Sequence, residues 1–325
     1  MNLPSKPSVI LHERISSLRA DLEAGLIGSS TLVERLIIGL LTGGHILIEG
    51  VPGLAKTRAV NRLADGLNVS RSRIQCTPDL MPADITGTSV WRQDRGIFEF
   101  VAGPLFHSVV LVDEINRAPP KVQSALLEAM AEGHVTAMGK TYPLPNPFMV
   151  VATQNPIEHE GTFPLPEAQL DRFLLYVVVT LPSPETELKI LELVEQESLG
   201  GDNPIGTQLL IDEIIAARKD VARVHLSPAI KDYIVRLVTA PRGDAAPEIR
   251  KLIEHPPSPR GTLTLASAAK AKAYISGRDY VTPDDVADLA PDALAHRMVL
   301  TWRAAADGET ARGVVARLLE HVAPL

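Results

Sequence analysis

The stretch Gly50–Thr57, with the sequence GVPGLAKT, constrains the fold of this chain more than any other stretch. The apolar residues of His45–Glu49 predict a buried strand before it, and the apolar spacing of Arg58–Leu67 predicts a helix after it. A strand, a glycine-bearing turn and Lys-Thr at a helix start form the layout of a phosphate-binding loop. Its glycines let the backbone approach a polyphosphate closely, and the helix N-terminus offers unpaired N–H groups.

Two side chains of this loop have separate expected roles. Lys56 can reach the β- and γ-phosphates, and the Thr57 hydroxyl can ligate Mg²⁺. The usual pattern is G-x-x-x-x-G-K-[ST], and Ala55 stands here where that pattern has glycine. We expect Ala55 to have a negative φ in the first turn of the helix, a conformation that alanine tolerates. Taken alone, the stretch also fits an ordinary Gly/Pro turn between a strand and a helix.

The composition bounds the class of protein. A chain of 325 residues suggests about two domains, and 45% hydrophobic with 22% charged residues is ordinary for a soluble protein. The net charge of −7 does not favour nucleic acid as a partner. Cys76 is the only cysteine, which excludes an internal disulfide and a thiolate metal cluster. We find neither a signal-peptide pattern nor an apolar run of the ~18–20 residues that span a bilayer, so we expect a cytoplasmic protein without membrane insertion.

Further apolar runs predict the fold class. They alternate with helical or hairpin segments and lie at Ser72–Cys76, Ser108–Val112, Pro147–Thr153 and Phe173–Val179. This alternation is typical of an α/β fold with a mostly parallel sheet that is buried on both faces. From residue 182 onward the chain reads as helical or loop-like. We therefore predict a nucleotide-binding core over residues 1–181 and an all-α lid domain over residues 182–325.

Two hairpins are predicted to interrupt the core. One lies in residues 85–103, around the turn Asp94–Gly96, and the other in residues 133–145, around Met138-Gly139. Both fit plain edge hairpins, and both also fit mobile loops that touch a substrate or a neighbouring subunit.

Two acids follow a predicted strand. Asp113 and Glu114 stand at the end of Ser108–Val112, and ligands bind at the carboxyl ends of parallel strands. Asp113 can hold Mg²⁺, directly or through water, and Glu114 can polarise the attacking water. A strand that ends in surface acids is the alternative. The phosphate loop upstream favours the catalytic interpretation, because the two motifs require each other chemically.

Three more side chains are candidates for contact with phosphate. Asn155 follows the strand Pro147–Thr153 and can hydrogen-bond the γ-phosphate or orient the water, although asparagine also suits a turn before proline. Arg172 precedes the last strand and can act as an arginine finger, or pair with a nearby acid. Arg260 lies in the first turn of a helix, where its charge opposes the helix dipole, so we expect it to serve an anion. A salt bridge to Glu254 is the alternative for Arg260.

These motifs together resemble the MoxR family of AAA+ ATPases. The resemblance covers about residues 25–300 in unbroken order, and the Ala55 variant matches the loop of that family. It rests on GVPGLAKT at Gly50–Thr57, VDEINR at Val112–Arg117, ATQNP at Ala152–Pro156, FPLPEAQLDRF at Phe163–Phe173 and SPRG at Ser258–Gly261.

The resemblance implies a P-loop AAA+ core with a five-stranded sheet in the order 5-1-4-3-2. Asp113 and Glu114 would form Walker B, Asn155 would be sensor 1, Arg172 the arginine finger acting in trans, and Arg260 sensor 2. The hairpin at 85–103 would be the helix-2 insert and that at 133–145 the pre-sensor-1 hairpin. Nucleotide-binding residues would be Ile27 and Gly28 at the adenine, and Gly50, Val51, Pro52, Gly53, Leu54, Ala55, Lys56, Thr57 and Arg58.

The resemblance also implies a function and partners. Family members act as chaperone-like ATPases, with ATP and Mg²⁺ as cofactors and often as hexameric rings. They frequently work with von Willebrand factor A-domain proteins to mature or activate other proteins and complexes. Two other classes stay open. One is a DNA or RNA motor of the same clade, which would need basic hairpin tips, and the other is a chelatase-type subunit for metal insertion, which differs only in its partner.

Overall fold

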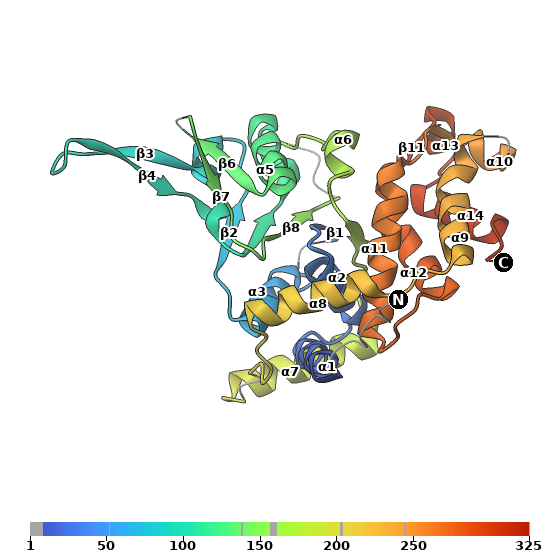
Figure 1. Cartoon of the computed structure of the whole chain (residues 1–325), viewed down its shortest axis with the longest axis horizontal. Coiled ribbons are helices and arrows are strands. Elements are labelled where there is room, and N and C mark those ends of the chain that lie inside the picture. Colours follow the sequence, from blue (N-terminus) through green and yellow to red (C-terminus); the bar gives the residue numbers. More distant parts are fainter. Residues whose placement is uncertain are drawn as a thin grey trace, which may run out of the picture. The chain divides into compact units, whose positions relative to one another are not determined.

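Five short strands form one parallel sheet in the computed structural model of this protein, which describes residues 9–51, 53–137, 139–156, 161–201, 204–243 and 245–324 (Figure 1). The strand order is β2-β5-β8-β1-β9, which confirms the predicted order 5-1-4-3-2. The strands span β1 (Ile46–Glu49), β2 (Arg71–Gln75), β5 (Val109–Asp113), β8 (Met149–Gln154) and β9 (Leu175–Val178).

The register of these strands determines which residues meet at one edge of the sheet. Glu49 of β1 lies opposite Gln154 of β8, and Asp113 of β5 lies opposite Gln75 of β2. β5 and β8 are also paired in parallel. Four strands therefore end side by side. The loops that follow their carboxyl ends lie along the same edge of the sheet.

The central strands are buried on both faces, as the apolar runs predict. Every residue of β5 is buried, and so is every residue of β8 except Gln154. The helices that precede, connect or follow the strands span α1 (Val9–Ala24), α2 (Ser30–Thr42), α3 (Lys56–Leu67), α4 (Pro82–Thr86), α5 (Pro120–Glu132), α6 (Glu167–Leu170), α7 (Pro184–Ser198) and α8 (Ile211–Arg223). None of the described helices has both the length and the hydrophobicity that a membrane crossing requires.

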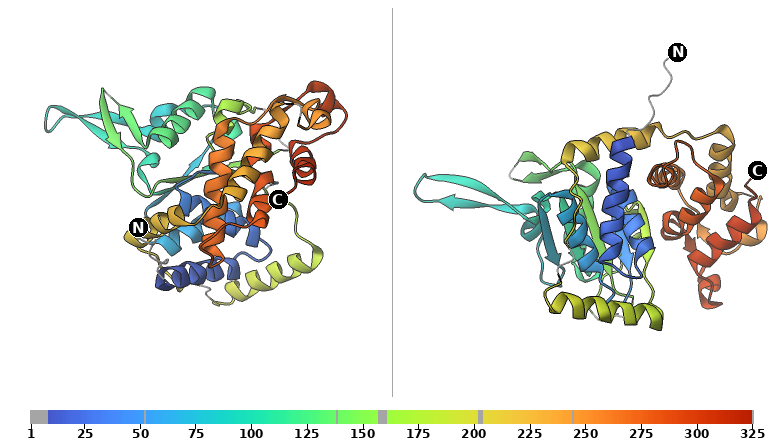
Figure 2. Two further views of the ribbon diagram at one scale, coloured as in Figure 1. Left: turned by 45° about the vertical axis from the view of Figure 1, so that its right-hand side comes forward. Right: turned by 90° about the horizontal axis from the view of Figure 1, so that it is seen from below.

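Two antiparallel hairpins interrupt the α/β pattern in the predicted segments. β3 (Gly87–Arg92) pairs with β4 (Ile97–Ala102), and this hairpin extends away from the sheet (Figures 1 and 2). β6 (His134–Ala137) pairs with β7 (Lys140–Pro143). Tyr142 of β7 stacks on Phe100 of β4, with ring centroids 4.2 Å apart, so an aromatic contact joins the two hairpins. Their identities as helix-2 insert and pre-sensor-1 hairpin remain predictions.

Internal contacts divide the described chain into two compact units. The unit that we call the core unit lies within residues 16–165 and 177–215, and it contains α7. The unit that we call the helical unit takes the chain up to residue 15, residues 166–176 and residues from 216 onward. The predicted domain boundary near residue 182 stays a prediction.

The helical unit is a bundle in which α11 packs against α9 and α12, and α12 packs against α14. Its helices span α9 (Pro228–Thr239), α10 (Pro247–Arg250), α11 (Pro259–Ile275), α12 (Pro283–Leu294), α13 (Trp302–Ala306) and α14 (Ala311–His321). It differs from an all-α expectation in one detail, because β10 (Ile253–His255) and β11 (Val299–Leu300) form a short antiparallel pair. Two and three residues are too few to show a period in the sequence.

A buried arginine organises the polar centre of the helical unit. Arg297 donates to Asp171 Oδ1 at 2.8 Å, to the carbonyl of Phe173 at 2.7 Å and to the hydroxyl of Thr264 at 3.3 Å. The other oxygen of Asp171, Oδ2, accepts from Arg260 at 3.1 Å. Burial lowers the pKa of Arg297 to about 10, and the nearby Asp171 carboxylate opposes that shift. Asp171 is thus the carboxylate that balances the buried guanidinium charge.

Replacing Asp171 with alanine should destabilise the protein by about 3–5 kcal/mol, because it leaves a buried charge without its counter-ion. Urea unfolding followed by circular dichroism measures the effect as a lower midpoint. Asp307→Ala, which replaces an exposed acid, is the matched control. Its free energy of unfolding should stay within about 0.5 kcal/mol of that of the original protein. An unchanged midpoint for Asp171→Ala would mean that the carbonyl acceptors alone compensate Arg297.

Candidate functional site

The loop between β1 and α3 has, in its described part, the predicted layout of a strand, a glycine-bearing turn and a helix start. β1 ends at Glu49, as the sequence predicts, and α3 begins at Lys56. Gly53 has φ +87°, a conformation in which a side chain is strained. The Nζ of Lys56 donates to the carbonyl of Gly50 at 2.6 Å, so the lysine folds back over the loop. Val51 and Leu54 are described, and Pro52 lies outside the described residues.

Ala55 does not have the negative φ that we expected. It has φ 52° and ψ 20°, and it stands immediately before the first residue of α3. The loop enters the helix through a left-handed residue, which explains why the common pattern has glycine at this position. Alanine in this conformation costs about 1–2 kcal/mol. The prediction was wrong because it assumed that the helix already includes residue 55.

Burial and nearby carboxylates both shift pKa values at this edge of the sheet. Burial lowers the pKa of Lys56, and the nearby Asp113, Glu114 and Glu49 oppose that shift. Burial raises the pKa of Cys76 to about 12, and Asp113 and Glu114 add to the rise. The carboxylates therefore favour the charged form of Lys56, and the Cys76 thiol stays protonated.

Asp113 and Glu114 lie at the end of β5, where they were predicted. Asp113 is buried, and its Oδ1 accepts from the Thr153 hydroxyl at 3.2 Å. The backbone N–H of Glu114 donates to that same hydroxyl at 3.0 Å. Glu114 has φ 56°, so the chain turns sharply after the strand and directs the two acids differently. Thr153, which the sequence analysis did not single out, thus links both acids to β8.

Side chains from neighbouring elements already contact both acids. Arg73 of β2 donates to Asp113 Oδ2 at 2.6 Å, and Gln75 of the same strand donates to Glu114 Oε2 at 3.1 Å. Arg117 also donates to Glu114 Oε2, at 3.2 Å. Sequence reasoning missed these three residues. The spacing of Arg73 and Gln75, two apart and therefore on one face of a strand, was the available signal.

The oxygen donors at this edge suit a hard cation. The Asp113 carboxylate and the half-buried Thr57 hydroxyl, at the second position of α3, are the kind of oxygen ligands that Mg²⁺ prefers. Asn155 follows β8 directly and is buried at the same edge. The residues present therefore fit a magnesium ion beside a phosphate loop. They would supply one or two ligands and leave the others to water and phosphate.

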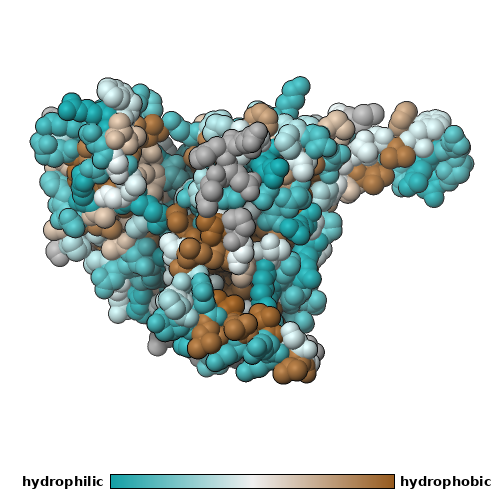
Figure 3. Space-filling view, turned by 180° about the vertical axis from the view of Figure 1, so that it is seen from behind, coloured by the Kyte–Doolittle hydropathy of each residue, from teal (hydrophilic) through white to brown (hydrophobic). Residues whose placement is uncertain are grey.

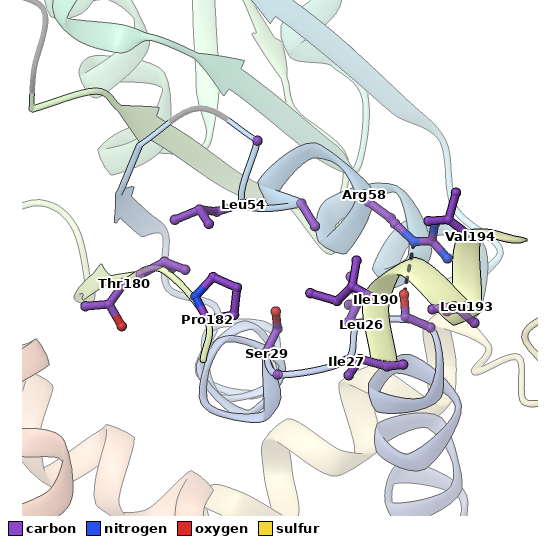
Figure 4. A pocket seen from close by; sticks show the side chains of 15 residues that line it. Leu26, Ile27, Ser29, Leu54, Arg58, Thr180, Pro182, Ile190, Leu193 and Val194 are labelled. Atoms are coloured by element: carbon purple, nitrogen blue, oxygen red, sulfur yellow. Dashed lines mark hydrogen bonds between the residues drawn. The ribbon is translucent and has the colours of Figure 1, made fainter. Parts of the chain in front are cut away.

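A pocket lies beside the phosphate loop within the core unit (Figure 4). Its empty space is about 620 Å³, part of which is open solvent. Ile27 and Gly28, predicted to contact adenine, line it together with the loop residues Gly53–Ala55 and with Arg58. Other lining residues are Gly25, Leu26, Ser29, Val179, Thr180, Pro182, Ile190, Leu193 and Val194.

Gly28 is required in this wall for a steric reason. It has φ +77°, and a Cβ at this position would stand 2.5 Å from the methyl group of Thr186 in α7. The backbone at residue 28 therefore approaches α7 as closely as a glycine allows.

Arg172 and Arg260 belong to the helical unit. Arg172 is exposed and follows α6, with its backbone N–H bonded to the carbonyl of Gln169 at 3.1 Å. Arg260 lies in the first turn of α11, and its half-exposed side chain pairs with Asp171 at 3.1 Å instead of with Glu254. The structure thus places the two arginines in one unit, on segments joined through Asp171.

Comparisons with known proteins agree with this arrangement. Residues 45–175 match the ATPase family associated with various cellular activities (AAA), and residues 234–318 match the AAA lid domain. The chain is similar to "Chaperone MoxR1" of Mycobacterium tuberculosis, at 46% identity over 92% of this chain and 79% of the relative. It is 31% identical to "Protein MoxR" of Methylorubrum extorquens, over 86% of each chain. A solved putative ATPase from Cytophaga hutchinsonii aligns with a TM-score of 0.89 and 40% identity, over 97% of this chain and 96% of the other.

Replacing Ala55 with glycine should stabilise the protein by up to about 1 kcal/mol, because relief of the left-handed strain exceeds the added entropy of the unfolded chain. Chemical denaturation measures the change. Ala316→Gly, at an exposed position inside α14, is the opposite-sign control and should destabilise by about 1 kcal/mol. Equal destabilisation by both substitutions would contradict the positive φ at residue 55.

Proposed function

Because the chain belongs to the MoxR family of AAA+ ATPases, we propose that it hydrolyses ATP with Mg²⁺ and uses the energy to remodel a partner protein in the cytoplasm. The observation that carries the proposal is the common edge of the sheet. The phosphate loop follows β1, the acid pair follows β5 and Asn155 follows β8, with a pocket beside the loop. Phosphoryl transfer requires this combination of positioned donors and acids.

In this proposal the residues of the core unit divide the work. The N-terminus of α3 and Lys56 bind the β- and γ-phosphates, and Lys56 leaves the Gly50 carbonyl to do so. Thr57 and Asp113 would hold Mg²⁺, which would supply positive charge beside the phosphate oxygens. Glu114 accepts a proton from the attacking water, and Asn155 orients that water or the γ-phosphate.

The pocket beside the loop receives the nucleoside in this proposal. Its lining is largely apolar, with Leu26, Ile27 and Leu193 among the side chains, and an adenine ring needs such surfaces on its two faces. Gly53–Ala55 belong to both the loop and the pocket, so a triphosphate on the loop places its base toward the apolar wall.

We further propose that the protein works as a homo-oligomer, a hexameric ring, with a von Willebrand factor A-domain protein as partner. The support is membership of a family whose relatives include a chaperone by name. In such a ring, Arg172 acts as an arginine finger at the ATP site of a neighbouring subunit. Arg260 acts as the γ-phosphate sensor, and to do so it leaves Asp171 and binds the γ-phosphate. Its exposed position makes that exchange inexpensive.

Replacing Glu114 with glutamine should lower the ATP turnover rate by about 10²–10⁴-fold while ATP binding is kept, because the amide cannot accept the proton. Phosphate release measures turnover, and equilibrium titration with ATP measures binding. Glu128→Gln, at an exposed glutamate of α5, is the matched control and should turn over normally. Turnover retained in Glu114→Gln would remove Glu114 from the role of base.

Mixing two inactive variants tests the finger in trans. Lys56→Ala lacks the phosphate-binding lysine and Arg172→Ala lacks the finger, so each alone should lose most activity. In a one-to-one mixture, roughly a quarter of the interfaces would combine an intact lysine with a neighbour's intact arginine, and activity should return in proportion. The absence of recovery at every mixing ratio would contradict a finger supplied by a neighbour.

A further inference from the structure

Helix α7 is attached to the core unit with little apolar burial. Not one of its described residues is buried, although its sequence is rich in leucine. Leu188 and Leu191 are 57% and 56% exposed, and apolar side chains form a band along the lower edge of Figure 3. Its inward residues, Ile190 and Leu193, are only half-buried. Packing alone therefore holds this helix weakly, since burial of apolar surface is the main source of such attachment.

A polar contact supplements this weak packing. One guanidinium, that of Arg58, reaches two elements at once. Its Nη1 donates to Glu197 Oε2 of α7 at 2.9 Å, its Nη2 donates to Glu197 Oε1, and its Nε donates to the carbonyl of Gly25 at 3.0 Å. The hydrogen bond with Arg58 is the main cause that lowers the pKa of the Glu197 carboxyl. A bidentate arginine–carboxylate pair fixes the relative orientation of the two side chains, and it is stronger than a surface ion pair with a single hydrogen bond.

This contact lies beside the wall of the pocket. Arg58 itself lines the pocket, and so do Ile190, Leu193 and Val194 of α7 (Figure 4). The turn Gly25–Ser29 forms an adjoining wall, and its first carbonyl is the third acceptor of Arg58, marked by the dashed line in Figure 4. The three donors of Arg58 thus tie together α3 and both walls.

We propose that the Arg58–Glu197 pair is a latch that holds α7 against the core unit and so closes the pocket around the nucleoside. Glu197 is in this sense a positioning residue for ATP, although it is not among the residues that line the pocket. The inference rests on the proposed function, because it assumes that the pocket receives the base of ATP.

The latch also couples the binding of the phosphates of ATP to the binding of its nucleoside. Arg58 directly follows Thr57 in α3, the helix whose N-terminus faces the phosphates. A nucleotide that binds both the loop and the pocket therefore favours the docked position of α7. By thermodynamic reciprocity, a docked α7 strengthens nucleotide binding by the same factor. An inorganic polyphosphate occupies only the loop and gains nothing from the latch.

The test compares Glu197→Gln with Glu195→Gln, an exposed glutamate of the same helix. The loss of one partly buried ion pair should increase hydrogen exchange of the α7 amides about three- to tenfold without nucleotide, and the control should not. Calorimetric titration should show ATP binding weakened by a similar factor in Glu197→Gln. Binding of inorganic tripolyphosphate, at the same Mg²⁺ concentration, should stay unchanged.

Each other outcome overturns the proposal in a distinguishable way. Unchanged ATP affinity in Glu197→Gln would mean that the latch does not close the pocket, even if exchange in α7 rises. Equal weakening of ATP and tripolyphosphate would mean that Glu197 acts on the loop or on the fold as a whole. A wild-type protein that binds neither ligand would overturn the proposed function first, and the latch with it.

Discussion

Parallel hydrogen bonding between β5, β8 and β1 is the interaction on which the candidate site depends. The pairing of Glu49 with Gln154, and of Val112 with Ala152, makes the three strands end together. The loop, the acids and Asn155 each follow one of these ends, although they are separated by up to about a hundred residues in sequence. A one-residue slip of any strand would turn its polar end toward the opposite face, because side chains alternate along a strand.

The same edge contains backbone strain. Among the described residues other than glycine, positive φ occurs at Ala55, Asn68 and Glu114, and two of these three stand at the candidate site. The left-handed turn at Ala55 starts α3 at Lys56, and the turn at Glu114 separates two adjacent carboxylates. The hydrogen bond from the Glu114 N–H to the Thr153 hydroxyl stabilises that second turn. Such strain persists only where surrounding structure determines the conformation, and it clusters at functional sites.

Local sequence patterns were sufficient for a mostly parallel sheet and for the two hairpins, whereas the strand order 5-1-4-3-2 came from the resemblance to the family. Apolar runs identify β1, β5 and β8 because these strands are buried on both faces. The conformation of Ala55 could not be predicted in this way, since the turn that precedes a helix is set by the loop and not by helical periodicity. Nor could the contact of Arg58 with Glu197, which are 139 positions apart and individually ordinary surface charges. Pairs of this kind depend on tertiary structure.

The charge balance around Asp113 shows how a buried acid can remain available to a new partner. A carboxylate in the interior needs compensation, and the Thr153 hydroxyl and Arg73 provide it here. The side chain of Arg73 is 58% exposed, whereas that of Asp113 is only 10% exposed. Separating an arginine that is already half in water from its carboxylate costs little, because water screens the pair and solvates the released charge. A fully buried partner such as Arg297, whose side chain is 1% exposed, could not be exchanged at that low cost.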